Sequence, residues 1–174
     1  MAAIERKIRR IMERYKDITY RPPEQFKSLG SFQRPRKKDY QNPNEQEKNE
    51  NAFRQLAKLS GRPVRALPVV QDGKKNPDGL LLDTGELVDV KVFDDITTKS
   101  AIGNAIKKAN KQGVTIVLID ARAGASSFVL GKGLYHALSP DMNRLIQKVV
   151  VLLPQNELKV YDASVYRKIR KGKH

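Results

Sequence analysis

The run Val114–Ile119, with the sequence VTIVLI, places the strongest constraint on what this chain can fold into. Its residues are almost continuously apolar, whereas a strand with one face in water alternates apolar and polar residues. A run of this length directly after Gly113 predicts a central strand that is buried on both faces. Both faces of its sheet must then be covered, which favours an α/β fold in which helices flank a mixed sheet.

The elements on either side of this run fit such a layered arrangement. The spacing of apolar residues predicts helices over residues 2–15, 44–60 and 97–112. A further helix is predicted from Ser139, which would cap it, with Pro140 at the first helical position. Strands are predicted over residues 64–70, 78–82, 87–93, 149–153 and 158–161. No element is assigned to residues 121–138.

The polar and basic beginning of the chain divides the sequence into parts. Residues 1–43 are predicted to form a basic helix followed by an extended arm or linker, because little in residues 16–43 is able to build a core. Residues 44–165 are predicted to form the globular domain, and residues 166–174 a basic tail. A length of 174 residues suits one such core.

Charge is the strongest signal in the composition. Lysine and arginine total 34 against 19 acidic residues, which gives a net charge of +15. A field of this sign attracts polyanions, of which nucleic acid is the commonest, with acidic membrane surfaces and acidic proteins as the alternatives. The absence of cysteine excludes a disulfide scaffold, a thiolate zinc site and a cysteine nucleophile.

No apolar run reaches the length of a membrane span, and the first residues, MAAIERKIRRIMERYK, contain no apolar signal core. We therefore expect a cytoplasmic protein, or one that other machinery delivers into the cytoplasm of a target cell.

The segment Leu87–Phe93 carries two opposite charges in the middle of a predicted strand. Side chains alternate between the faces of a strand, so its three valines face the core while Asp89 and Lys91 share the other face. Charges among apolar neighbours are costly unless they are paired or used. This strand is therefore the first place to look for chemistry.

A hairpin turn would bring a third charged residue to the same face. With Thr84 and Gly85 as a two-residue turn, Asp78 lies opposite Lys91 and beside Asp89. A slip of one residue would move Asp78 to the other face. Two carboxylates suit a hard divalent cation, Mg²⁺ or Mn²⁺ in preference to Zn²⁺. The cation would activate a water near a phosphate, and the lysine would orient that water or stabilise the developing charge.

The sequence Asn-Pro-Asp ending at Asp78, followed by Asp-Val-Lys over residues 89–91, resembles the PD-(D/E)XK nuclease motif. In that family a preceding helix commonly carries an acidic residue. Glu50 fits this role because it lies three residues before Phe53, whereas Glu47 is turned further toward solvent. The resemblance implies a restriction-endonuclease-like fold and a catalytic set of Glu50, Asp78, Asp89 and Lys91, the three carboxylates binding the metal.

From Asn44 to Tyr161 the chain is similar to the C-terminal nuclease domains of contact-dependent growth-inhibition toxins, particularly the tRNase-like group. The similarity includes the catalytic strands and the segment Lys108–Gly113 before an apolar strand. It implies tRNA as the substrate and a small immunity protein as a partner. The residues before Asn44 and the starting methionine depart from a toxin domain cut from a long exoprotein, which leaves the delivery route open.

Alternatives remain open at the level of the sequence. Lys107, Lys108 and Lys111 share one helix and are candidates for phosphate contacts, with a solvated helix face as the alternative for each. Asp78 and Lys91 could form an ordinary cross-strand ion pair. The rival functions are a non-enzymatic nucleic-acid-binding or structural protein, such as a phage or mobile-element component, and a DNA repair or junction-resolving nuclease. These residues do not decide whether the substrate is RNA or DNA, and they do not decide the oligomeric state.

Overall fold

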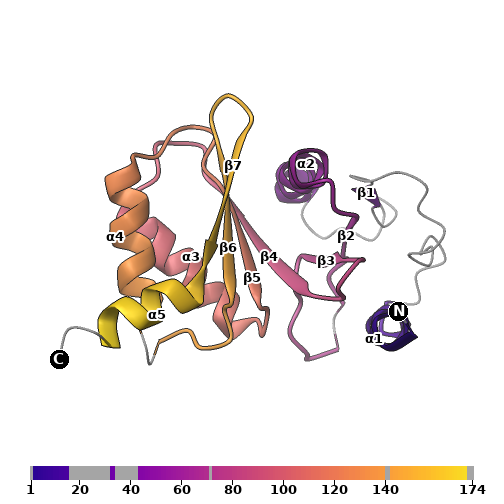
Figure 1. Cartoon of the computed structure of the whole chain (residues 1–174). Helices are drawn as coiled ribbons and strands as arrows, with labels where there is room; N and C mark the ends of the chain where they lie inside the picture. The colour runs from indigo at the N-terminus through magenta and orange to yellow at the C-terminus, as the bar shows by residue number, and fades with distance from the viewer. Residues whose placement is uncertain (1, 16–31, 34–42, 71, 140–141, 172–174) are drawn as a thin grey trace. The chain divides into compact units, whose positions relative to one another are not determined.

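Figure 1 shows the computed structural model, which describes residues 2–15, 32–33, 43–70, 72–139 and 142–171. The chain divides into two units, Met1–Leu87 and Val88–His174, and each is a mixed α/β arrangement. None of the helices in the described ranges is long and apolar enough to cross a membrane.

The first unit contains short strands and two helices in its described part. The helices are α1 (Ala2–Glu13) and α2 (Pro43–Ser60), and the strands are β1 (Phe32–Gln33), β2 (Val64–Ala66) and β3 (Gly79–Leu81). Strand β1 pairs with β2 in parallel, and β2 pairs with β3 antiparallel. The strand predicted over 64–70 is thus shorter than expected, although Leu67 N–H continues the ladder by donating to the Asp78 carbonyl oxygen at 2.9 Å.

Helix α1 packs its apolar side against the strands of this unit. The buried cluster consists of Ile8, Met12, Leu67, Leu80 and Leu82. Full burial of each large aliphatic side chain contributes about 1.5–3 kcal/mol, so this helix is held by core packing and not only by its own propensity. Most of the predicted arm that follows α1 lies outside the described residues, apart from Phe32–Gln33, which form β1.

The second unit is built around parallel strands. Its helices are α3 (Lys99–Lys111), α4 (Ser127–Ala137) and α5 (Ala163–Lys171), and its strands are β4 (Leu87–Val92), β5 (Ile116–Asp120), β6 (Lys148–Leu153) and β7 (Glu157–Asp162). Strands β4, β5 and β6 are parallel, and β7 runs antiparallel beside β6. Every residue of β5 is buried, as the apolar run predicts. Figure 1 shows α3 and α4 on the same side of these strands.

Local capping signals define the helices of this unit. The Thr98 hydroxyl accepts from the Ala101 N–H at 3.2 Å at the start of α3, and Gly113 follows its end with a φ of +78°. Ser126 caps α4 by accepting from the Val129 N–H at 3.1 Å. Helix α4 occupies the stretch that the sequence left unassigned, where Gly131 and Gly133 weaken the helical signal.

The helix predicted from Ser139 is wrong for the residues that the structure describes there, because residues 142–147 form bends, turns and irregular chain. Its intended apolar face would include Met142 and Leu145, which are 51% and 50% exposed, so only Ile146 is buried. Asn143 instead takes a left-handed φ of +50°, and Gln147 N–H donates to the Thr115 carbonyl oxygen at 2.8 Å. The return of the chain to β6 overrides the local helix signal.

The turn that leads from β3 into β4 is longer than the two-residue turn predicted. Leu81 N–H donates to the Glu86 carbonyl oxygen at 2.9 Å, and Gly85 N–H donates to the Leu81 carbonyl oxygen at 2.8 Å. Gly85 has a left-handed φ of +74°, and Leu82 is buried in the cluster under α1. Leu82 therefore belongs to the turn, and the two-residue turn of Thr84 and Gly85 is wrong.

The basic end of the chain is also more structured than a solvated tail. Residues 166–171 belong to α5. The Arg167 Nη2 donates to the carbonyl oxygens of Asn143 and Ile146 at 3.1 and 2.9 Å. Arg167 therefore fastens α5 to the turn before β6.

Candidate active site

Glu50 lies on the buried side of α2, with only 6% of its surface exposed. One turn later, Phe53 packs directly on Gly79, where an added Cβ would lie 2.6 Å from Phe53 Cζ. Gly79 follows Asp78 in the chain, and Asp78 itself is half-buried. The side of α2 that carries Glu50 thus contacts the end of the strand that carries Asp78.

The segment 72–76 before Asp78 is held by Arg14, which follows α1. The Arg14 Nε and Nη2 atoms donate to the Asp72 carboxylate at 2.9 and 2.8 Å, and Nη1 donates to the Lys75 carbonyl oxygen at 2.5 Å. The hydrogen bond from Arg14 lowers the pKa of Asp72 to about 2, and the same bond raises the pKa of Arg14. The approach to Asp78 is therefore tied to the N-terminal helix.

Asn76 closes the same loop from within. Its Oδ1 accepts from the Val70 N–H at 2.9 Å, and its Nδ2 donates to the Val70 carbonyl oxygen at 3.2 Å. This is the loop-shaping role that Asn residues commonly fill. Together with the Leu67 bond to the Asp78 carbonyl oxygen, it orders the backbone on both sides of Pro77.

Asp89 and Lys91 lie on one face of β4, as alternation predicts. They are opposite Val117 and Ile119 of β5. Asp89 is buried, with 7% of its surface exposed, whereas Lys91 is exposed. The Lys91 Nζ lies 5.9 Å from the centroid of the Phe93 ring, a cation–π distance that steadies the ammonium group. A buried carboxylate and an exposed cation thus share one strand face.

The four predicted catalytic residues fall into two pairs, Glu50 and Asp78 in the first unit and Asp89 and Lys91 in the second. Across the described parts of the chain, no group of three His, Cys, Asp or Glu side chains is placed to hold a metal ion. The carboxylate oxygens available are nevertheless of the kind that Mg²⁺ and Mn²⁺ prefer.

Arg65 is a buried cation that the sequence analysis did not single out. It is 0% exposed in β2, opposite Leu80. Burial lowers the pKa of its guanidinium to about 10, so it stays charged at neutral pH. A single arginine between Val64 and Ala66 was the available signal in the sequence. It places positive charge inside the unit that contains Glu50 and Asp78.

Asp120 and Arg122 form an ion pair at the end of β5. The Arg122 Nη2 and Nε atoms donate to the two Asp120 carboxylate oxygens at 2.7 and 2.9 Å. Asp120 is 3% exposed and lies opposite Val92, so it is on the other face of the strands from Lys91. The bidentate geometry indicates a structural role in closing this strand end.

Lys107, Lys108 and Lys111 are all exposed on α3. The opposite side of the helix is buried through Ile102, Ala105, Ile106 and Ala109. The three lysines are therefore accessible to phosphates, and Lys107 also lines a pocket between α3 and α4.

No protein-family model matches this chain, and no curated protein matches it. Among solved structures, a CdiA-CT/CdiI toxin and immunity complex from Burkholderia pseudomallei is similar to it, with a TM-score of 0.48 and 16% sequence identity. The match covers 66% of this chain and 86% of the other. The PD-(D/E)XK assignment stays a prediction from the sequence.

Proposed function

We propose that this protein is a metal-dependent nuclease that cleaves RNA, with tRNA as the expected substrate, and that it acts as a toxin-like effector. The observation that carries the proposal is the pair Asp89 and Lys91, a buried carboxylate and an exposed ammonium group on one face of β4. Burying a carboxylate such as Asp89 among valines costs free energy, which a strand with only a structural role would avoid by carrying an apolar residue there.

Asp78 belongs to the same proposal, because the sequence motif groups it with Asp89 and Lys91. Two carboxylates that lie close together repel unless a cation lies between them, which is the requirement of a divalent metal site.

Each side chain then has a defined task. A bound Mg²⁺ or Mn²⁺ would supply a Lewis acid and an acidified water. Asp78 and Asp89 would hold the cation, and Glu50 would complete or orient its ligand shell from α2. The ammonium group of Lys91 would donate to the phosphate oxygen as negative charge develops, or orient the attacking water.

The substrate class follows from charge. A net charge of +15 and the exposed lysines of α3 favour a polyphosphate chain, whose backbone contacts release counterions. The choice of tRNA rests on the sequence resemblance to tRNase-like toxin domains. A cognate immunity protein that neutralises the enzyme belongs to the same proposal.

A cleavage assay tests the proposal. Purified protein is incubated with total tRNA and with plasmid DNA in Mg²⁺, in Mn²⁺ and in chelator, together with the variants Asp78→Asn and Asp95→Asn. Asp95 is an exposed aspartate just after β4 and serves as the matched control. We expect metal-dependent tRNA cleavage by the wild type and Asp95→Asn, and a loss of about 100-fold or more in Asp78→Asn.

The same assay separates the rival functions. The large positive charge also fits a protein that only binds nucleic acid. Tight, salt-sensitive binding without cleavage in any metal would replace the nuclease proposal with that role. Cleavage of plasmid DNA but not of tRNA would indicate a DNA repair or junction-resolving enzyme.

A further inference from the structure

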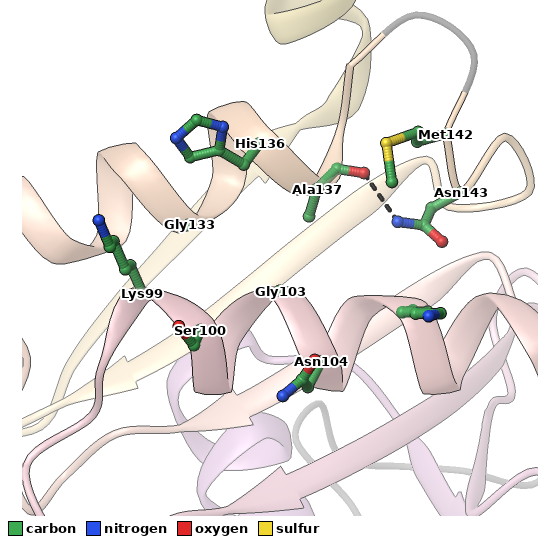
Figure 2. A pocket seen from close by; sticks show the side chains of 10 residues that line it. Lys99, Ser100, Gly103, Asn104, Gly133, His136, Ala137, Met142 and Asn143 are labelled. Carbon is green, nitrogen blue, oxygen red and sulfur yellow. Dashed lines mark hydrogen bonds between the residues drawn. The ribbon is translucent and has the colours of Figure 1, made fainter.

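A pocket of about 350 Å³ lies between α3 and α4 in the second unit, and Figure 2 shows Met142 and Asn143 among the residues that line it. Gly103 leaves open space there, because a Cβ added at this position would meet no atom within 4 Å. The volume is in the range of pockets that hold small organic groups. None of the four residues proposed for catalysis lines it.

Two lysines give the pocket its charge. Lys99 and Lys107 both line it from α3 and are exposed to solvent. They are separated by eight residues, which corresponds to about 12 Å along a helix axis. None of the described residues that line the pocket is acidic, so these ammonium groups favour an anionic ligand.

The remaining lining suits a nucleobase. His136 presents an exposed ring from α4, and Met142, 51% exposed, adds an apolar surface. Unpaired RNA bases commonly stack on aromatic rings, histidine included, and their edges form hydrogen bonds. The amide of Asn104 and the hydroxyl of Ser100 supply donors and acceptors for such an edge.

Met142 and Asn143, which line the pocket, are held by hydrogen bonds before any ligand binds. Asn143 Nδ2 donates to the Ala137 carbonyl oxygen at 2.8 Å, as the dashed line in Figure 2 shows. Met142 N–H donates to the Ser139 carbonyl oxygen at 2.9 Å, and Arg167 donates to the Asn143 carbonyl oxygen at 3.1 Å. A preorganised wall reduces the entropy lost when a ligand is bound.

We propose that this pocket binds one unpaired nucleotide of the RNA substrate. The base lies against His136 and Met142, and the flanking phosphates contact Lys99 and Lys107. The identity of the ligand as RNA rests on the proposed function, whereas the pocket itself is separate from the proposed catalytic residues. Binding and cleavage are therefore expected to fail independently.

A substitution that fills the pocket gives the sharpest test. A Cβ added at Gly103 meets no atom within 4 Å, so Gly103→Leu enters the open space, and leucine favours a helix more than glycine does. Gly131 on α4 is also open around its Cβ but does not line the pocket, which makes Gly131→Leu the matched control. A third variant, Lys99→Ala with Lys107→Ala, removes the two cations.

Affinity is measured by fluorescence anisotropy in chelator, so that no cleavage interferes. The probes are a labelled unpaired oligoribonucleotide of roughly 12 nucleotides, a common footprint for single-strand binders, and a duplex of the same sequence. We expect Gly103→Leu to weaken binding of the unpaired probe about fivefold or more, and Gly131→Leu to change it less than twofold. The double lysine variant should flatten the salt dependence by about one phosphate contact per lysine.

Unchanged affinity in Gly103→Leu would overturn the proposal, whether or not the protein cleaves RNA. A second measurement follows the NMR resonances of His136 while nucleoside monophosphates are added. If these resonances shift but Gly103→Leu binds the oligoribonucleotide as the wild type does, the pocket binds free nucleotides, and the proposal of an RNA-binding pocket is overturned. If Gly103→Leu weakens RNA binding but the wild type cleaves no nucleic acid, the pocket proposal stands and the nuclease proposal is wrong.

Discussion

Asp89 and Lys91 are two residues apart on β4, yet one is buried and the other is exposed. The valines between and beside them hold the strand in place through the core, so the charged face is positioned by packing on the opposite side. We therefore expect the exposed charge of Lys91 to serve the reaction and to contribute little to folding.

Replacing Lys91 by alanine should separate these two effects. Because the side chain is exposed, the free energy of unfolding should change by less than about 0.5 kcal/mol. Cleavage of tRNA should fall by about 100-fold or more, since the transition state loses its cation. Lys159→Ala, an exposed lysine of β7, is the control for thermal melts and turnover. Equal activity of the two variants would remove Lys91 from the site.

The bond between Arg14 and Asp72 predicts a pH dependence of stability. The Asp72 carboxyl has a folded pKa of about 2, below its ordinary value of 3.8, because Arg14 hydrogen-bonds the ionised form. A lowered pKa stabilises the fold above pH 3.8, and this contribution is lost as pH falls through about 2. Asp72→Asn should therefore lower Tm at pH 7 and match the wild type at pH 2. The control Asp95→Asn should differ from the wild type in Tm by the same small amount at both pH values. A Tm difference between Asp72→Asn and the wild type that is as large at pH 2 as at pH 7 would contradict this pH dependence.

Among the helices, the close contact between α3 and α4 depends on the absence of a side chain at Gly133. A Cβ at Gly133 would lie 2.9 Å from Ile102 Cβ and 3.0 Å from the Lys99 carbonyl oxygen. Such distances force a shift of one helix, and overpacking of this kind costs about 1–3 kcal/mol.

Two alanine substitutions on α4 should consequently have opposite signs. Gly133→Ala should destabilise the protein, because the clash exceeds the gain in helix propensity of roughly 0.5–1 kcal/mol. Gly131→Ala, two residues away with open space around its Cβ, should stabilise by that gain. Denaturant unfolding of both variants measures the difference. Stabilisation of both would mean that the helices are farther apart than described.

The elements that could be predicted from sequence are those with local signals. Helix α3 is preceded by its cap Thr98 and followed by Gly113, and β5 lies within the apolar run that begins at Val114. The Ser139 helix failed, since Met142 and Leu145 have no core to face. The predicted two-residue turn was wrong. Leu82 lies in the buried cluster with Ile8 of α1, a residue more than 70 positions away, and no local pattern contains such a contact.

The sequence predicted which strand face Asp89 and Lys91 share, but not which side chains pack around the candidate residues. The alternation that put Asp89 and Lys91 on one face is a local property of a strand, and the structure retains it. The burial of Arg65 and the contact of Arg14 with Asp72 depend on long-range packing in the first unit, and the only local sign of either was the single arginine between Val64 and Ala66.

At the scale of the whole chain, α1 is part of a core and not only a basic extension. Ile8 is 0% exposed in the cluster with Leu80 and Leu82. Ile8→Ala should lower the free energy of unfolding by about 2–5 kcal/mol, whereas Ile96→Ala, at a position 74% exposed, should be close to neutral. Equal stability of the two variants in denaturant would show that α1 does not contribute to the fold.

Asp89→Asn gives the sharpest test of the proposal that Asp78 and Asp89 hold a metal ion for phosphodiester cleavage. Wild type, Asp89→Asn and the control Asp95→Asn are titrated with Mn²⁺, and the same samples are assayed on total tRNA. We expect Asp89→Asn to keep its circular dichroism spectrum but to lose both Mn²⁺ binding and cleavage, and Asp95→Asn to keep both. Cleavage by Asp89→Asn at the wild-type rate, or cleavage by the wild type in chelator, would contradict it.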